Sequence, residues 1–113
     1  MKKEIIISGF GGQGVMSIGK NLVEAGMAEG FHVTWAPSYG PEMRGGTANC
    51  SVVISDRPIG SPVFTYSTEL IAMNAPSIDK FGPLVRSGGL VLVNSSVVTA
   101  EFVRPGIKTI YVP

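Results

Sequence analysis

The chain has 113 residues, of which 44% are hydrophobic and 15% are charged, and its formal net charge is +1. This length predicts one domain, 1–113, and the charge leaves no basic stripe of the kind that binds nucleic acid. No apolar run approaches the roughly 20 residues of a membrane span, and a single cysteine, Cys50, excludes an internal disulfide or a cysteine-ligated cluster. We therefore expect a cytoplasmic domain, and its low charge suggests that apolar surface meets another chain.

The chain opens with a strand, a glycine turn and a helix. The isoleucines at 5–7 run without polar interruption, which is typical of a strand covered on both faces. Apolar residues recur at helical spacing after the glycines, so a helix is predicted over about 14–29, and Gly30 should end it in a left-handed cap.

The glycine turn is a candidate seat for a cofactor, another ligand or a partner. Its members are Gly9, Gly11, Gly12 and Gly14. The first, second and fourth match G-x-G-x-x-G between a strand and a helix, where bare backbone N–H groups attract anions. NAD binding also needs an acidic residue at the end of the second strand, and 31–37 contains none. Three alternatives stay open: a phosphate or other anion, a partner's backbone, or a turn that serves only tight packing.

A second strand is predicted over 31–36, and the loop 37–46, PSYGPEMRGG, leaves its carboxyl end without regular structure. Open α/β sheets place their ligand crevice at this edge. Arg44 either pairs with Glu42 on a solvated loop or anchors an interface together with Tyr39, because tyrosine and arginine dominate interface hot spots. The interface residues predicted here are Tyr39, Glu42, Met43 and Arg44.

The remaining pattern predicts a doubly wound, Rossmann-like α/β domain of three layers with a mostly parallel sheet. Further strands are expected over 47–55, 69–74, 89–94 and 109–112, and a helix over 77–86, with Ser77 as its cap and Gly88 and Gly89 closing it. Two helices cannot cover both faces of about six strands. We therefore expect the fold to be incomplete at its carboxyl end, so that either the chain continues or a partner covers the gap.

No catalytic set and no metal site are predicted. His32 is the lone histidine and reads as a packing or surface residue, and Cys50 reads as an inert buried thiol. The serines have no histidine or acid nearby in sequence to form a hydrolase triad. Asn74 and Asn94 end predicted strands, where they either bond a ligand or shape turns.

Several segments together resemble the γ subunit of the 2-oxoacid:ferredoxin oxidoreductases, over essentially all 113 residues. They are GFGGQGV, WAPSYGPEMRGGTANCSVVIS, IAMN, the SIDKF helix and LVLVNSS. SYGPEMRGG is the most specific of them, and it is most like the 2-oxoglutarate and ketoisovalerate types; the family also includes pyruvate enzymes.

The resemblance implies a subunit of a complex that oxidatively decarboxylates a 2-oxoacid to an acyl-CoA and passes electrons to ferredoxin. It implies α and β partners that hold thiamine diphosphate with Mg, a ferredoxin-like δ subunit or domain with iron–sulfur clusters, and coenzyme A in the complex. This chain alone is expected to hold none of these cofactors and to be inactive. The alternative is a stand-alone nucleotide-binding or small-ligand-binding protein that uses the glycine turn.

Overall fold

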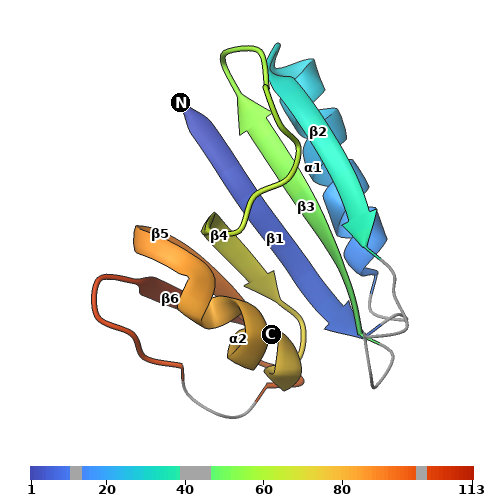
Figure 1. The fold of residues 1–113 in the computed structure, drawn as a ribbon. Coiled ribbons are helices and arrows are strands. Elements are labelled where there is room, and N and C mark those ends of the chain that lie inside the picture. Colours follow the sequence, from blue (N-terminus) through green and yellow to red (C-terminus); the bar gives the residue numbers. More distant parts are fainter. Residues whose placement is uncertain (11–13, 39–46, 99–101) are drawn as a thin grey trace.

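The structure is a computed structural model that describes residues 1–10, 14–38, 47–98 and 102–113 (Figure 1). The elements are β1 (Lys2–Phe10), α1 (Val15–Ala28), β2 (His32–Ser38), β3 (Thr47–Ser55), β4 (Ser67–Ala72), α2 (Ala75–Phe81), a 3-10 turn η3 (Gly82–Leu84), β5 (Val85–Asn94) and β6 (Lys108–Val112). The strand predicted over 47–55 is confirmed in full.

The described strands form one sheet in the order β2-β3-β1-β4-β5-β6. The pairs on the β4 side of β1 are all parallel, whereas β3 pairs antiparallel with both β1 and β2. Among the described strands, β3 alone therefore runs against the rest, so the prediction of a mostly parallel α/β sheet is confirmed. The insertion of β3 between β1 and β2 was not predicted, because a hydrophobic period does not encode strand direction.

The two faces of the sheet carry separate apolar clusters. On β1, Ile5 and Ile7 pack with Val15 of α1, while Ile6 packs with Ile78 of α2. The three consecutive isoleucines thus serve both faces, as a strand covered on two sides requires. We call these faces the α1 side and the α2 side.

The first helix is confirmed within one residue at each end, α1 running from Val15 to Ala28. Gly14 is its N-cap with φ of 76°, and Gly30 follows its end with φ of 84°, a conformation that a side chain would strain. α1 packs on β2, β3 and β1 and lies behind β2 and β3 in Figure 1. Its residue Gly19 lets the helix approach closely, since a Cβ there would lie 2.6 Å from the Cys50 sulfur.

The second helix differs from its prediction. It begins at Ala75 and ends at Phe81, and its N-cap is Asn74, whose Oδ1 accepts a hydrogen bond of 3.0 Å from the Ser77 backbone N–H. Ser77 is therefore not the cap. Gly88 and Gly89 do not close the helix; they lie within β5, which begins before them.

The bounds of two other strands also differ from those predicted. β4 covers Ser67–Ala72 rather than 69–74, and β2 continues through Pro37 and Ser38, which were predicted as loop. Pro37 is tolerated because β2 is an edge strand of the described sheet, where a missing N–H can face solvent.

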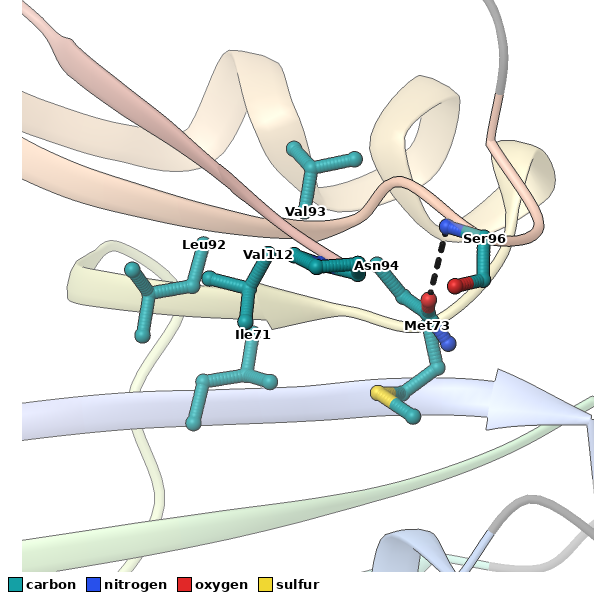
Figure 2. Close-up of a pocket in the computed structure, with 8 residues that line it drawn as sticks. Ile71, Met73, Leu92, Val93, Asn94, Ser96 and Val112 are labelled. Atoms are coloured by element: carbon teal, nitrogen blue, oxygen red, sulfur yellow. Dashed lines mark hydrogen bonds between the residues drawn. The ribbon is translucent and has the colours of Figure 1, made fainter.

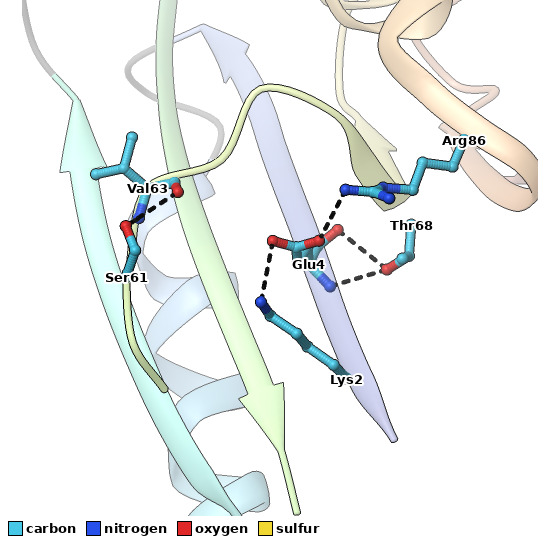
Figure 3. Close-up of polar contacts among 6 residues, drawn as sticks. All are labelled: Lys2, Glu4, Ser61, Val63, Thr68 and Arg86. Atoms are coloured by element: carbon cyan, nitrogen blue, oxygen red, sulfur yellow. Dashed lines mark hydrogen bonds and ion pairs between the residues drawn. The ribbon is translucent and has the colours of Figure 1, made fainter. Parts of the chain in front are cut away.

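A polar seam joins β1 to β4 at the amino ends of these strands (Figure 3). Thr68 Oγ1 accepts a hydrogen bond of 2.8 Å from the Glu4 N–H and donates one of 3.1 Å to the Glu4 carbonyl. The Glu4 carboxylate lies 3.5 Å from Arg86 and 3.8 Å from Lys2. These contacts fix the register where β1 and β4 begin to pair, at the edge opposite the glycine turn.

Candidate functional site

The strand register places the described strand ends that flank the predicted site segments at one edge of the sheet. Gly9 is buried in β1 and faces Ala48 of β3, while Ser38 at the end of β2 faces Asn49. β1 and β2 therefore end at the same edge of the sheet, with β3 between them, and this is the carboxyl edge of β1 and β2. This is where open α/β folds place their ligands.

Only part of the predicted site can be placed. Gly14 is exposed at the start of α1, with no side-chain cap and with no acidic residue in the first helical turn. First-turn N–H groups of a helix carry partial positive charge, so this end suits an anion or a carbonyl. Gly11 and Gly12 lie outside the described residues. The turn as a ligand or partner seat stays a prediction.

The four interface residues predicted from sequence also lie outside the described residues: Tyr39, Glu42, Met43 and Arg44. The ends of their loop are placed by Ser38 and by the pairing of Thr47 with Phe10. The interface prediction itself is not tested.

A buried polar cluster at the ends of β1 and β4 was missed from sequence. The Ser77 hydroxyl donates a hydrogen bond of 2.5 Å to Asn74 Oδ1, and its oxygen lies 2.7 Å from Ser8 Oγ, whose hydroxyl can donate to it. All three residues are at most 2% exposed. Asn74 Nδ2 has no hydrogen-bond partner among the described residues. The sequence did carry a signal for Asn74 as a helix cap, since an asparagine followed two residues later by a proline, here Pro76, is typical of a helix start.

The polar cluster cannot activate a nucleophile, because it consists of hydroxyls and an amide without a base. Cys50 is fully buried, and burial raises the pKa of its thiol, while a hydrogen bond with Trp35 acts in the opposite direction. The thiol therefore stays protonated at neutral pH, which agrees with the prediction of an inert cysteine. His32 is exposed at the start of β2, at the other edge of the sheet.

An apolar hollow of about 360 Å³ lies over β4, β5 and β6 (Figure 2). Its lining residues are Ile71, Met73, Leu92, Val93, Asn94, Ser96, Val112 and Pro113. The side chains of Ile71, Met73, Leu92 and Val112 meet there, and the register adds Ile110, which faces Leu92. We call these five residues the open face. It belongs to the α1 side, since Ile71 and Met73 pack against the cluster that contains Val15.

The polar residues beside the open face shape the chain. Asn94 Oδ1 accepts a hydrogen bond of 3.1 Å from the Ser96 N–H, and its backbone carbonyl accepts one of 2.9 Å from Val98. Asn94 therefore forms a turn at the end of β5, one of the two roles predicted for it.

Within the described ranges, no group of three or more histidine, cysteine, aspartate or glutamate side chains is placed to hold a metal ion. The helices of the same ranges are too short or too polar to cross a membrane.

The family model for pyruvate ferredoxin/flavodoxin oxidoreductase matches residues 4–113. The chain belongs to this family. Ketoisovalerate oxidoreductase subunit VorA of Methanothermobacter thermautotrophicus is 47% identical over 107 residues, which are 95% of this chain and 22% of VorA. 2-Oxoglutarate synthase subunit KorC of Methanocaldococcus jannaschii is 38% identical over 89% of this chain and 54% of KorC. The chain thus spans about a fifth of VorA and about half of KorC.

Solved structures of the family share the fold. The gamma subunit of a keto/oxoacid ferredoxin oxidoreductase from Geobacter sulfurreducens is 34% identical, with a TM-score of 0.81 over 98% of this chain and 60% of that subunit. A 2-oxoglutarate:ferredoxin oxidoreductase from Magnetococcus marinus, solved with 2-oxoglutarate, coenzyme A and succinyl-CoA, is 20% identical with the same TM-score. At that identity the likeness shows the fold alone.

Proposed function

We propose that this chain acts as the gamma part of a cytoplasmic 2-oxoacid:ferredoxin oxidoreductase. In the proposed reaction a 2-oxoacid and coenzyme A yield an acyl-CoA and carbon dioxide, and the released electron pair reduces ferredoxin. The observation that carries the proposal is the likeness to the Geobacter gamma subunit, at 34% identity over 98% of this chain. The likeness to VorA and KorC favours a branched-chain 2-oxoacid or 2-oxoglutarate as substrate.

The residues of this chain do not fit the cofactors of such a reaction. A four-thiolate iron–sulfur cluster needs four cysteines, and the sequence has one, which is buried. Decarboxylation needs an electron sink that ordinary side chains do not supply. We therefore assign thiamine diphosphate with Mg to α and β partners, the clusters to a ferredoxin-like δ partner, and a supporting role to this chain.

The supporting role is assigned to the edge of the sheet where β1 and β2 end and β3 begins. Ser38, the last described residue before Tyr39 and Arg44, lies at this edge at the end of β2, and α1 begins after β1 with Gly14 as its N-cap. We propose that the loop contacts the thiamine-binding partners and that the glycine turn receives backbone or an anionic ligand from them.

The test is reconstitution of the complex. The chain is co-expressed with the thiamine-binding pair and the ferredoxin-like chain of an oxidoreductase from the same organism. Reduction of ferredoxin that depends on a 2-oxoacid is then followed with coenzyme A present. We expect no turnover from the single chain and turnover from the complex, with 2-oxoglutarate, ketoisovalerate and pyruvate compared as substrates. Turnover by the purified single chain, or a complex indifferent to its presence, would contradict the proposal.

The substitution Arg44→Ala tests whether this residue contributes to the proposed interface. Loss of a charge-assisted bond or a moderate hot spot should weaken assembly by about 1–3 kcal/mol, measured as the concentration of chain that gives half-maximal activity. Arg57→Ala is the control, because Arg57 is exposed in the turn after β3, at the opposite edge. Equal behaviour of the two variants would remove Arg44 from the interface and leave the family assignment unchanged.

A further inference from the structure

β2 has one unpaired backbone edge within the part of the chain that the structure describes. It is the end strand of the described sheet, and its neighbour there is β3 (Figure 1). An edge strand presents a row of N–H and C=O groups that can pair with another chain, and proteins often protect such edges with lysines or bulges. Over its seven residues, HVTWAPS, β2 has no lysine and pairs with β3 without a bulge. This edge is therefore available for strand pairing.

Trp35 gives the edge an anchor for another chain. It is the middle residue of β2 and faces Val52 of β3, so it lies on the α1 side. Its indole hydrogen-bonds the Cys50 thiol and lies close to Gly19 of α1, yet the residue is still 36% exposed. Tryptophan is enriched among interface hot spots, and a side chain that is already held in place loses little entropy on binding.

A shallow hollow beside Trp35 is too small for a metabolite and suits a side chain. Its volume is about 130 Å³, and its lining residues are Lys20, Val23, Glu24 and Trp35. Ligand pockets usually measure about 300–1,000 Å³. Lys20 and Glu24 are exposed, carry opposite charges and lie one turn apart on α1, and Met27 of the same helix is 61% exposed. This flank therefore offers apolar contact and charges of both signs to a polypeptide.

The residue pattern of β2 is complementary to itself. If two copies pair antiparallel about Trp35, that residue lies opposite Trp35 of the second copy, and Val33 lies opposite Pro37. These three residues are apolar and lie on the α1 side, since they face Val52, Ile54 and Cys50 of β3. The alternate residues of β2 are polar or small and would meet one another on the other face. No pair of like charges is brought together.

The same twofold arrangement brings opposite charges together. α1 packs on β3 as well as on β2, and three strand spacings, about 14 Å, would separate β3 of one copy from β3 of the other. A helix with its side chains is about 10 Å wide, so the two α1 helices would leave a gap that the two indole rings can fill. Because the twofold axis passes beside Trp35, Lys20 of each copy comes opposite Glu24 of the other, a complementary arrangement.

We propose that the edge of β2, together with the adjoining flank of α1, is an interface between two copies of this chain. The pairing joins the two described six-stranded sheets into one continuous sheet. Pro37 offers a carbonyl group but no N–H, so the side chains around Trp35 contribute more than the backbone pairing does. The proposal does not rest on the reaction assigned to the complex.

The test follows Trp35 itself, because it is the single tryptophan of the chain. The purified chain is studied by sedimentation velocity and by tryptophan emission from about 1 µM to about 1 mM, the range expected for a weak interface. We expect a monomer–dimer equilibrium and a shift of the emission to shorter wavelength with the same midpoint concentration. Backbone amides of β2 should gain protection from hydrogen exchange as the dimer forms.

Charge reversals at two exposed positions of α1 test the arrangement without changing the core. Lys20→Glu alone, or Glu24→Lys alone, places like charges opposite each other and should raise the dimer dissociation constant about tenfold. The double variant Lys20→Glu/Glu24→Lys restores opposite charges and should return within about threefold of the parent. Lys80→Glu, at an exposed position of α2, is the matched control and should leave the association unchanged. Circular dichroism checks that each variant folds.

Three results would overturn the proposal. The first is a folded chain that stays monomeric up to about 1 mM. The second is a dimer in which the emission of Trp35 does not change, or in which the double variant is as weak as the single ones, since the contact would then lie on another surface. The third is protection of β2 that appears only when other subunits are added, since a strand of another chain would then occupy the edge. None of these results bears on the oxidoreductase assignment, which is read from activity of the whole complex.

Discussion

The two halves of the sheet differ in strand direction and in how their faces are covered. In the half formed by β2, β3 and β1, an antiparallel strand sits between two strands of like direction, and α1 covers one face. In the half formed by β4, β5 and β6, every pair is parallel, and the described cover lies on the α2 side. Antiparallel sheets tolerate a solvated face and parallel sheets rarely do. The half with the stricter requirement is thus the half with the open face.

The largest expected effect on stability compares a leucine on each face of the half formed by β4, β5 and β6. Leu70→Ala should lower the free energy of unfolding by about 2–5 kcal/mol, because Leu70 is fully buried in the α2-side cluster. Leu92→Ala removes the same atoms from the open face and should cost about 1 kcal/mol, because that side chain already meets water. Urea denaturation measures both. Equal losses would mean that the open face is packed in solution, by a second copy or by the chain itself.

The next effect probes how closely α1 approaches its half of the sheet. Gly19→Ala should cost about 1–3 kcal/mol, since the new methyl group would lie 2.6 Å from Cys50 Sγ and 2.8 Å from Trp35 Nε1. Adding Cys50→Ala should recover part of this loss, and a double-mutant cycle gives the coupling. Ser17→Ala, at an exposed position of the same helix, is the control. A neutral Gly19→Ala would show that α1 can move away from β3.

In the polar seam between β1 and β4, we expect the hydrogen bonds to contribute more to stability than the charges do. Thr68→Val removes the partner of both Glu4 backbone groups and should cost about 1–2 kcal/mol. Glu4→Gln keeps those bonds and should cost less than about 1 kcal/mol, because Lys2 and Arg86 are more than half exposed. Thermal unfolding at low and high salt separates the contribution of the hydrogen bonds from that of the charges. If Glu4→Gln lost more stability than Thr68→Val, and lost it in a salt-dependent way, the charges would matter more than the hydrogen bonds.

The smallest effect concerns Cys50 and alkaline pH. Burial raises the pKa of its thiol above the ordinary value of 9.0, so the unfolded chain releases this proton before the folded chain does. The resulting stability is fully present below about pH 9 and is lost as the pH rises through the folded pKa. Unfolding measured from pH 8 upward should show this slope in the parent and a shallower one in Cys50→Ala. A thiol reagent that labels the native protein quickly would contradict the burial.

Local patterns predicted individual elements well where one physical signal dominated. The isoleucines at 5–7 indicated a two-faced strand, Gly30 indicated the end of α1, and the strand over Thr47–Ser55 was bounded by glycines and a turn. The family followed from specific motifs such as SYGPEMRGG and is confirmed by the family match. The incompleteness of the cover was inferred by counting helices against strands.

Other features depended on contacts between distant residues and were not predictable in this way. Ser77 and Asn74 are both good caps, and the choice of Asn74 is linked to the bond from Ser77 to Ser8, far away in sequence. The pair Gly88–Gly89 looked like a helix end, but a Cβ on Gly89 would meet the Thr68 carbonyl at 2.6 Å, so this glycine serves the approach of β5 to β4. β1 and β2, which precede the predicted site segments, end at the edge that the topology supports, while the site residues themselves stay predictions.

The reversed strand β3 also constrains the order in which the molecule can assemble. The helix crossover from β1 to β2 leaves a space one strand wide, which only residues 47–55 fill. Phe10 pairs with Thr47 and Lys2 with Ser55, and the amino group of Met1 then lies 2.9 Å from Asp56. Closing this long loop is a slow, entropically costly step. On the ribosome, β1 therefore cannot complete its pairing with β3 until Ser55 has emerged, and the backbone groups along that edge of β1 lack their β3 partners during that interval.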